Sequence, residues 1–122
     1  MKNLVAFFEI PATDFGRAVK FYETVLGVQL YVVDCDTEKM AFFPEENEQC
    51  SGAISWAKDF NPSKEGVLVH LQVENMETIM IAIEKIGGKI TLPKTKIEAE
   101  GRGYFSLFID SEGNRLGLYS DK

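Results

Sequence analysis

Few side chains in this chain of 122 residues could carry out acid–base, nucleophilic or metal chemistry. His70 is the only histidine, and Cys35 and Cys50 are the only cysteines. A zinc site needs Cys or His ligands at characteristic spacings, and the sequence contains no CxxC or comparable Cys/His pattern. A cysteine nucleophile would have to use the one histidine as its base. We therefore expect both cysteines to be free thiols, as in a reducing compartment, and not catalytic nucleophiles.

Residues 8–30 predict a strand and a helix that could position such groups. The apolar start ends at Pro11, and Thr13 or Asp14 can cap a helix. Apolar side chains then recur at helical spacing, and Gly27 is typical of a helix end. This apolar stripe consists of Phe15, Ala18, Val19, Tyr22, Val25 and Leu26.

The same pattern occurs again at residues 68–90. An apolar strand leads to Asn75, a second candidate cap, and a second stripe ends at Gly87 and Gly88. An offset of about 61 residues superposes the two stretches, as expected for an internal repeat. The offset places Phe7 on Leu68, Glu9 on His70, Phe15 on Met76 and Gly27 on Gly88.

Three strand-like runs follow each predicted helix. They cover residues 28–34, 38–44 and 52–57 in the first half, and residues 89–93, 103–110 and 114–120 in the second. The polar segment 58–66 contains Asn61 and Pro62 and is typical of a linker. The sequence therefore predicts one α+β domain over residues 1–122. Module one covers about 1–58 and module two about 66–122, each with the order βαβββ.

Composition and charge disfavour several classes of partner. The net charge of −6 opposes binding to nucleic acid, which depends on Lys and Arg contacts with phosphates. No apolar run approaches the ~20 residues of a membrane helix. The first residues lack the long apolar region and cleavage site of a signal peptide. We expect a cytoplasmic protein that uses neither nucleic acid nor membrane as a partner.

The paired βαβββ pattern resembles the vicinal oxygen chelate superfamily, which includes lactoylglutathione lyase, extradiol dioxygenases and bleomycin-resistance proteins. The stretch FEIPATDFGRAVKFYETVLG is similar to the opening strand and helix of that family. GGKITLPKT followed by GYFSLFIDSEGNRLGLYS is similar to a bacterial group of lactoylglutathione-lyase-related proteins. The resemblance implies an eight-stranded, curved, incompletely closed barrel around a cleft, with the helices outside. It also implies a homodimer, for which open sheet edges give a physical reason.

Metal-dependent members of this family hold a divalent ion with one residue from each of four strands. The resemblance places these residues at Phe7, Ser55, Leu68 and Gly117. Only Ser55 has a donor atom, a weak hydroxyl, whereas a divalent ion needs several N, O or S donors. We therefore expect no metal and no cofactor, and we do not expect the Lewis-acid chemistry of the metal-dependent relatives.

Strand alternation places Glu9 on the face of Phe7, His70 on the face of Leu68, and Tyr119 on the face of Gly117. We expect Glu9 and His70 to approach each other in the cleft. Three interpretations stay open: a proton-transfer pair, a structural ion pair, and a shifted metal site with two ligands.

Other residues are candidates for binding a ligand in the cleft. Phe7, Trp56 and Tyr104 could line an apolar slot for a flat molecule, with core packing as the competing interpretation. Arg102, between two glycines, could hold an anionic group, although most such arginines are solvated loop charges. A glycine inside a strand marks a close approach or extra space, so Gly117 is expected to widen the pocket.

These features favour a small-molecule-binding protein of the vicinal oxygen chelate fold that lacks the usual metal ligands. The alternative is a metal-independent lyase or isomerase that uses Glu9 or His70 for proton transfer. A third interpretation is a structural or regulatory dimer with a vestigial pocket. The fold alone does not decide whether the protein is an enzyme.

Overall fold

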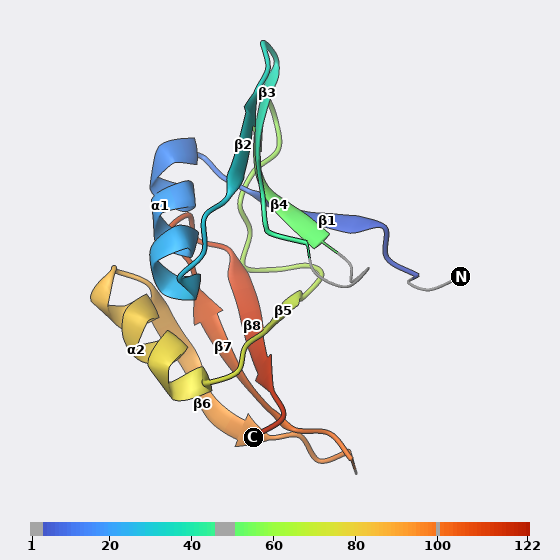
Figure 1. Cartoon of the computed structure of the whole chain (residues 1–122), viewed down its shortest axis with the longest axis vertical. Helices are drawn as coiled ribbons and strands as arrows, with labels where there is room; N and C mark the ends of the chain where they lie inside the picture. Colours follow the sequence, from blue (N-terminus) through green and yellow to red (C-terminus); the bar gives the residue numbers. More distant parts are fainter. Residues whose placement is uncertain (1–3, 46–50, 100) are drawn as a thin grey trace. The chain divides into compact units, whose positions relative to one another are not determined.

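Two helices and eight strands make up the part of the chain that the computed structural model describes, residues 4–45, 51–99 and 101–122 (Figure 1). Contacts divide the chain into two compact units, residues 1–62 and 63–122. The boundary lies inside the segment expected to be the linker. No helix in the described residues is long and apolar enough to cross a membrane.

Each unit has the predicted order βαβββ. The first contains β1 (Phe7–Pro11), α1 (Phe15–Leu26), β2 (Tyr31–Asp34), β3 (Glu38–Phe42) and β4 (Ser51–Ala57). The second contains β5 (His70–Gln72), α2 (Met76–Lys85), β6 (Lys89–Lys96), β7 (Tyr104–Ile109) and β8 (Arg115–Ser120).

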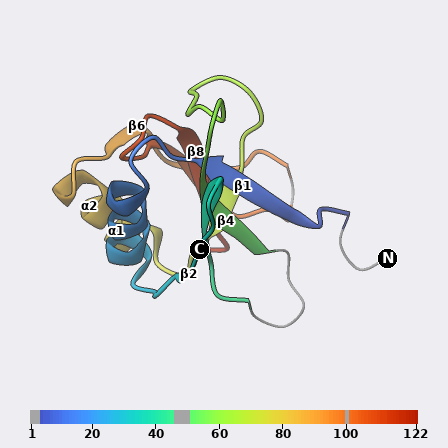
Figure 2. The ribbon, with the colours of Figure 1, turned by 90° about the horizontal axis from the view of Figure 1, so that it is seen from above.

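The strands form one four-stranded sheet in each unit and not a closed barrel. The orders are β1-β4-β3-β2 and β5-β8-β7-β6, so the two sheets have the same topology. In each sheet the first strand is parallel to the last strand of its unit, and the other neighbours are antiparallel. Figure 2 shows α1 beside the strands of its own sheet.

Helix α1 packs on one face of the first sheet. Asp14 caps it, because the Asp14 carboxylate accepts a hydrogen bond from the Arg17 N–H at 3.1 Å. The helix ends at Gly27, whose φ of 67° is the left-handed conformation that glycine adopts easily. The rings of Tyr22 and Phe8 both contact Phe43, with centroids 5.8 and 6.1 Å away. The buried core of the unit also includes Ile10, Ala18, Phe21, Val25, Ala41 and Ile54.

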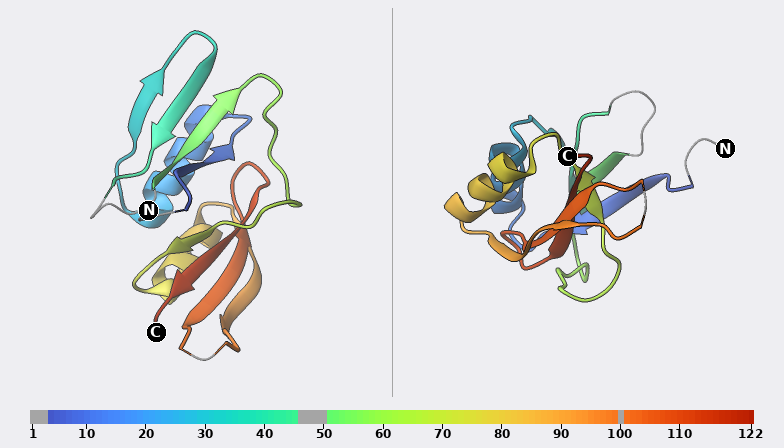
Figure 3. Two further views of the ribbon diagram at one scale, coloured as in Figure 1. Left: turned by 90° about the vertical axis from the view of Figure 1, so that its right-hand side faces the viewer. Right: turned by 90° about the horizontal axis from the view of Figure 1, so that it is seen from below.

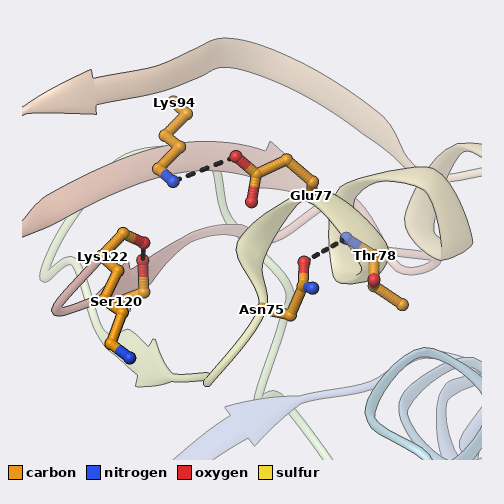
Figure 4. Close-up of polar contacts among 6 residues, drawn as sticks. All are labelled: Asn75, Glu77, Thr78, Lys94, Ser120 and Lys122. Carbon is orange, nitrogen blue, oxygen red and sulfur yellow. Dashed lines mark hydrogen bonds and ion pairs between the residues drawn. The ribbon is translucent and has the colours of Figure 1, made fainter.

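Helix α2 repeats this arrangement with a different end. Asn75 is its cap and accepts from the Thr78 N–H at 3.0 Å (Figure 4). The helix has 10 residues where α1 has 12, and Gly87 (φ 96°), one of the two glycines predicted to end it, takes the left-handed conformation. Its own buried residues are Met76 and Ile83, and the buried core of the unit also includes Phe108, Leu116 and Leu118.

Two strand boundaries differ from the prediction. Strand β2 begins at Tyr31 and not at residue 28, because the Leu30 N–H donates to the Glu23 carboxylate at 2.9 Å instead of entering the sheet. Strand β6 continues through Pro93 to Lys96. Proline is tolerated there because β6 is an edge strand, where one row of N–H groups has no strand partner.

The turn between β7 and β8 fixes the start of the second unit. The buried Asp110 carboxylate accepts from the N–H groups of Glu112 and Asn114 at 2.8 and 2.9 Å. The Asn114 side chain accepts from the Ser63 N–H at 3.0 Å, and the Arg115 N–H donates to the Ser63 carbonyl. Residues at the end of the linker are thereby attached to this turn.

Candidate functional site

Several of the candidate residues lie on the sheet faces that the helices do not cover, which we call the helix-free faces. In the first unit, Glu9 pairs with Ala53 and Ala53 with Phe42, while Pro11 pairs with Ser55. Paired residues of neighbouring strands share a face, and Ile10 and Ile54 lie on the opposite face, under α1. Phe7, Glu9 and Ser55 are therefore together on the helix-free face of the first sheet.

A hydrogen bond orients the Glu9 carboxylate. The Ser55 hydroxyl donates to Oε1 of Glu9 at 2.8 Å. Ser55 is buried, and its carbonyl accepts from the Ala12 N–H at 2.9 Å, so the donor is well fixed. Glu9 is exposed, and Phe7 two residues earlier is 52% exposed on the same face. The first unit thus presents a positioned carboxylate beside an accessible aromatic ring.

The second unit presents an imidazole. His70 pairs with Gly117, Gln72 with Tyr119, and Tyr119 with Phe105, which places all five on the helix-free face of the second sheet. The His70 ring lies over Gly117, because a Cβ added at Gly117 would collide with the imidazole. The ring also meets Phe105 edge to face, with centroids 6.0 Å apart. The space above Gly117 is therefore filled by His70, which corrects the expectation that this glycine simply widens a pocket.

Tyr119 uses its hydroxyl to hold a loop. The hydroxyl accepts from the Gly103 N–H at 3.2 Å and donates to the Asp121 carboxylate at 3.1 Å. Arg102, the neighbour of Gly103, is exposed, and its N–H donates to the Ala99 carbonyl. Tyr119 therefore positions the loop that carries Arg102.

Two predicted aromatic residues are not brought together with the others. Trp56 follows Ser55 on β4 and so faces the α1 side, with Lys39 Nζ 5.9 Å from its ring. Tyr104 precedes Phe105 on β7 and faces the α2 side, where Lys94 and Lys96 lie 4.8 and 5.3 Å from its ring. Strand alternation separates both rings from the helix-free faces.

Phe105 and Gln72 also lie on the helix-free face of the second sheet, although the sequence did not single them out as candidates. Phe105 precedes the buried Ser106, and Gln72 follows the half-buried Leu71. That alternation was a usable signal, but it required knowing which face α2 covers. Leu68 lies two residues before the start of β5 and is half-buried. Glu9 and His70 belong to different units, and their approach stays a prediction.

The strand register changes one of the inferred family ligand positions. Glu9 is opposite Ala53 and its repeat equivalent His70 is opposite Gly117, so Ala53, and not Ser55, is the counterpart of Gly117. Ala53 has no donor atom either. Over residues 4–45, 51–99 and 101–122, no group of three or more His, Cys, Asp or Glu side chains could hold a metal ion. The donor set that these residues offer does not fit the family's metal site.

Comparisons with solved structures find the same fold in several proteins. An antibiotic-binding protein from a Streptomyces species superposes with a TM-score of 0.74 at 18% identity, over 100% of this chain and 99% of that one. A hypothetical protein from S. aureus superposes with a TM-score of 0.68 at 18% identity, over 98% of this chain and 94% of that one. A glyoxalase I variant from Zea mays superposes with a TM-score of 0.71 at 19% identity. The match covers 95% of this chain but only 45% of the maize chain. At these identities the likeness shows the fold alone.

The comparison with curated proteins found no match. A family model described as the Glyoxalase/Bleomycin resistance protein/Dioxygenase superfamily matches residues 4–118. This match covers nearly the whole sequence and includes both βαβββ units. The chain therefore belongs to the Glyoxalase/Bleomycin resistance protein/Dioxygenase superfamily.

Proposed function

We propose that this protein binds a small, flat, largely apolar molecule on a helix-free sheet face without a metal ion. The observation that carries the proposal is the exposed His70 imidazole, which lies over Gly117 and against Phe105. Small-molecule sites combine apolar and aromatic walls with a few fixed polar groups. His70, Phe105 and Leu107 share this face and give that combination in the second unit.

The first unit supports the same proposal. Its helix-free face offers the ring of Phe7 and the Glu9 carboxylate that Ser55 orients. A carboxylate favours a ligand that also carries a positive or hydrogen-bond-donating group, in keeping with the net charge of −6. The antibiotic-binding protein with the same fold shows that a protein of this architecture can bind a small molecule.

The proposal includes a setting and an assembly. The exposed thiol of Cys35 is compatible with a reducing cytoplasm, where we place the protein. We place Cys50, which lies outside the described residues, in the same reduced state. We further propose a homodimer, because each sheet ends in edge strands that can pair with another chain.

A thermal-shift screen with planar heteroaromatic and polycyclic compounds tests the binding proposal. Compounds that bind the folded protein raise its melting temperature in proportion to the logarithm of their concentration. We expect Phe105→Ala to weaken binding of a hit by roughly tenfold, about 1.4 kcal/mol. Tyr104→Ala is the matched control, since it removes the adjacent ring from the opposite face of β7. Equal effects of the two substitutions would place the ligand elsewhere, and a screen without hits would favour a vestigial pocket.

The second candidate function is metal-independent proton transfer by Glu9 in a lyase or isomerase. The Ser55 hydrogen bond favours it, because it fixes one carboxylate oxygen and leaves Oε2 without a hydrogen bond to any described residue. In such an enzyme Glu9→Gln abolishes turnover and leaves ligand binding and folding nearly intact. If Glu9 has only a structural role, the main effect is a loss of roughly 1 to 3 kcal/mol of stability. Turnover of a screening hit by the wild type and by this variant separates the two cases.

A further inference from the structure

We infer that β2 is the edge at which two copies of this chain join, as an antiparallel pair of strands across a two-fold axis. Strand β2 is the outer strand of the first sheet, and β3 is its only strand neighbour among the described residues (Figure 3, left). The inference rests on the proposed homodimer and assigns it an interface.

The backbone of β2 is suited to accept another strand. All four of its residues pair with β3 in an uninterrupted register, from Tyr31 opposite Phe42 to Asp34 opposite Lys39. A regular edge strand exposes a row of N–H and C=O groups that another strand can pair with. The segment has no proline to remove a donor and no glycine to weaken the strand.

The equivalent strand of the second unit is protected against such pairing. Strand β6 holds the place of β2 in its sheet, but it contains Pro93 and two register irregularities, between Ile90 and Leu92 and between Leu92 and Thr95. It also carries three lysines, Lys89, Lys94 and Lys96. Lysine, proline and bulges are the features that block edge-to-edge association.

The lysines of β6 are also held in place. Lys94 donates to the Glu77 carboxylate at 3.0 Å (Figure 4), and the ammonium groups of Lys94 and Lys96 lie over the ring of Tyr104. The same position of the fold is thus blocked by charge in one unit and open in the other. This contrast within one chain indicates that the open edge of β2 has a partner.

The side chains of β2 complement a second copy of themselves. Tyr31 and Val32 are 72% and 48% exposed. In a two-fold antiparallel pairing centred on Val32, each Val32 meets its counterpart and each Tyr31 meets Val33 of the second copy. Aromatic and β-branched residues are favourable cross-strand pairs, so the Val32–Val32 and Tyr31–Val33 contacts should both stabilise this register.

Charge supports this register. Residues 30–33 are Leu, Tyr, Val and Val, so the centre of the pairing is uncharged, and Asp34 falls opposite Leu30 at its ends.

The whole chain carries a net charge of −6, so the two copies repel each other at long range. Salt screens that repulsion, and added salt should therefore strengthen the dimer.

Sedimentation velocity of the full chain tests this interface. We expect the wild type to be a dimer, Val32→Lys to be a folded monomer with a cooperative thermal transition that no longer depends on protein concentration, and Tyr31→Lys to weaken the dimer. Ile81→Lys is the matched control, because Ile81 is a 56% exposed apolar residue on α2 and is not part of the proposed strand pairing, so this variant should stay dimeric. A monomeric wild type at all concentrations, or a folded Val32→Lys dimer, would overturn the inference.

A cross-link tests the register. The proposed pairing places Val32 opposite Val32 of the second copy, so Val32→Cys in a Cys35→Ser, Cys50→Ser background should form a covalent dimer under mild oxidation. Val33→Cys in the same background should not, because residue 33 meets Tyr31 of the second copy. Failure to cross-link while the wild type is dimeric would assign the interface to another register or surface. Ligand binding by a monomeric wild type would leave the proposed function standing and remove only the β2 interface.

Discussion

At the scale of single residues, Gly117 determines how the second unit presents its histidine. The absence of a side chain at this position lets the His70 imidazole lie across β8 and meet Phe105. In the first unit the equivalent contact is absent, because Ala53 stands opposite Glu9 and the carboxylate turns to Ser55 instead. One internal repeat therefore carries two different chemical groups at equivalent positions.

Gly117→Ala should lower the free energy of unfolding by about 1 to 3 kcal/mol, the usual cost of overpacking. The added Cβ must displace the His70 ring, while the strand conformation itself accepts alanine. In a His70→Ala background the same substitution should cost little, and the difference measures the coupling between the two residues. Urea unfolding of the wild type, Gly117→Ala, His70→Ala and the double variant gives the four free energies of unfolding. An equal cost in both backgrounds would show that the contact between the His70 ring and Gly117 does not contribute to the free energy of unfolding.

The faces of single residues were only partly predictable from the sequence. Glu9, Ser55 and Gly117 were assigned to the faces on which the structure places them. Trp56 and Tyr104 were grouped with them but lie on the opposite faces. Trp56 directly follows Ser55, and Tyr104 directly precedes Phe105, so alternation turns each ring away from the helix-free face. Phe105 was overlooked because its exposure depends on the position of α2, which alternation alone does not give.

At the scale of elements, helix starts were easier to predict than strand ends. Asp14 and Asn75 cap the two helices as their side-chain chemistry predicts. The bounds of β2 and β6 depend on features outside each strand's own pattern, such as the hydrogen bond from the Leu30 N–H to Glu23, seven residues earlier, and the edge position that tolerates Pro93. The pairing of β1 with β4 spans more than 40 residues, so no local pattern distinguished Ala53 from Ser55 as the counterpart of Gly117.

The ion pair between α2 and β6 should make a small pH-dependent contribution to stability. The hydrogen bond from Lys94 is the main reason why the pKa of Glu77 lies below its ordinary value of 4.5. Because the folded-state pKa is lowered, this contribution is complete above pH 4.5 and is lost as the pH falls through the lowered value. Glu77→Gln should therefore reduce stability at neutral pH and lose its effect in acid.

Urea unfolding of wild type and Glu77→Gln from neutral to acidic pH gives this dependence. Glu84→Gln is the control, since its exposed side chain lies on the same helix and makes no hydrogen bond or ion pair with a described residue. The effect should be small because Glu77 is solvent-exposed. A difference between wild type and Glu77→Gln that grows on acidification would contradict the assignment.

At the scale of the whole molecule, the repeated βαβββ order was readable from caps, stripes and glycine stops, and the family match over residues 4–118 agrees with it. The reaction or ligand was not readable, because proteins of one fold differ in the few side chains on their sheet faces. Here those side chains are an oriented carboxylate in one unit and, in the other, an imidazole that meets Phe105 edge to face. We interpret them as groups that bind a small molecule directly.

Calorimetric titration of a planar screening hit into chelator-treated and untreated protein tests this interpretation most directly. We predict the same stoichiometry and affinity in both samples, and an affinity roughly tenfold lower, about 1.4 kcal/mol, in Phe105→Ala. Binding that disappears with the chelator and returns with a divalent ion would contradict the account.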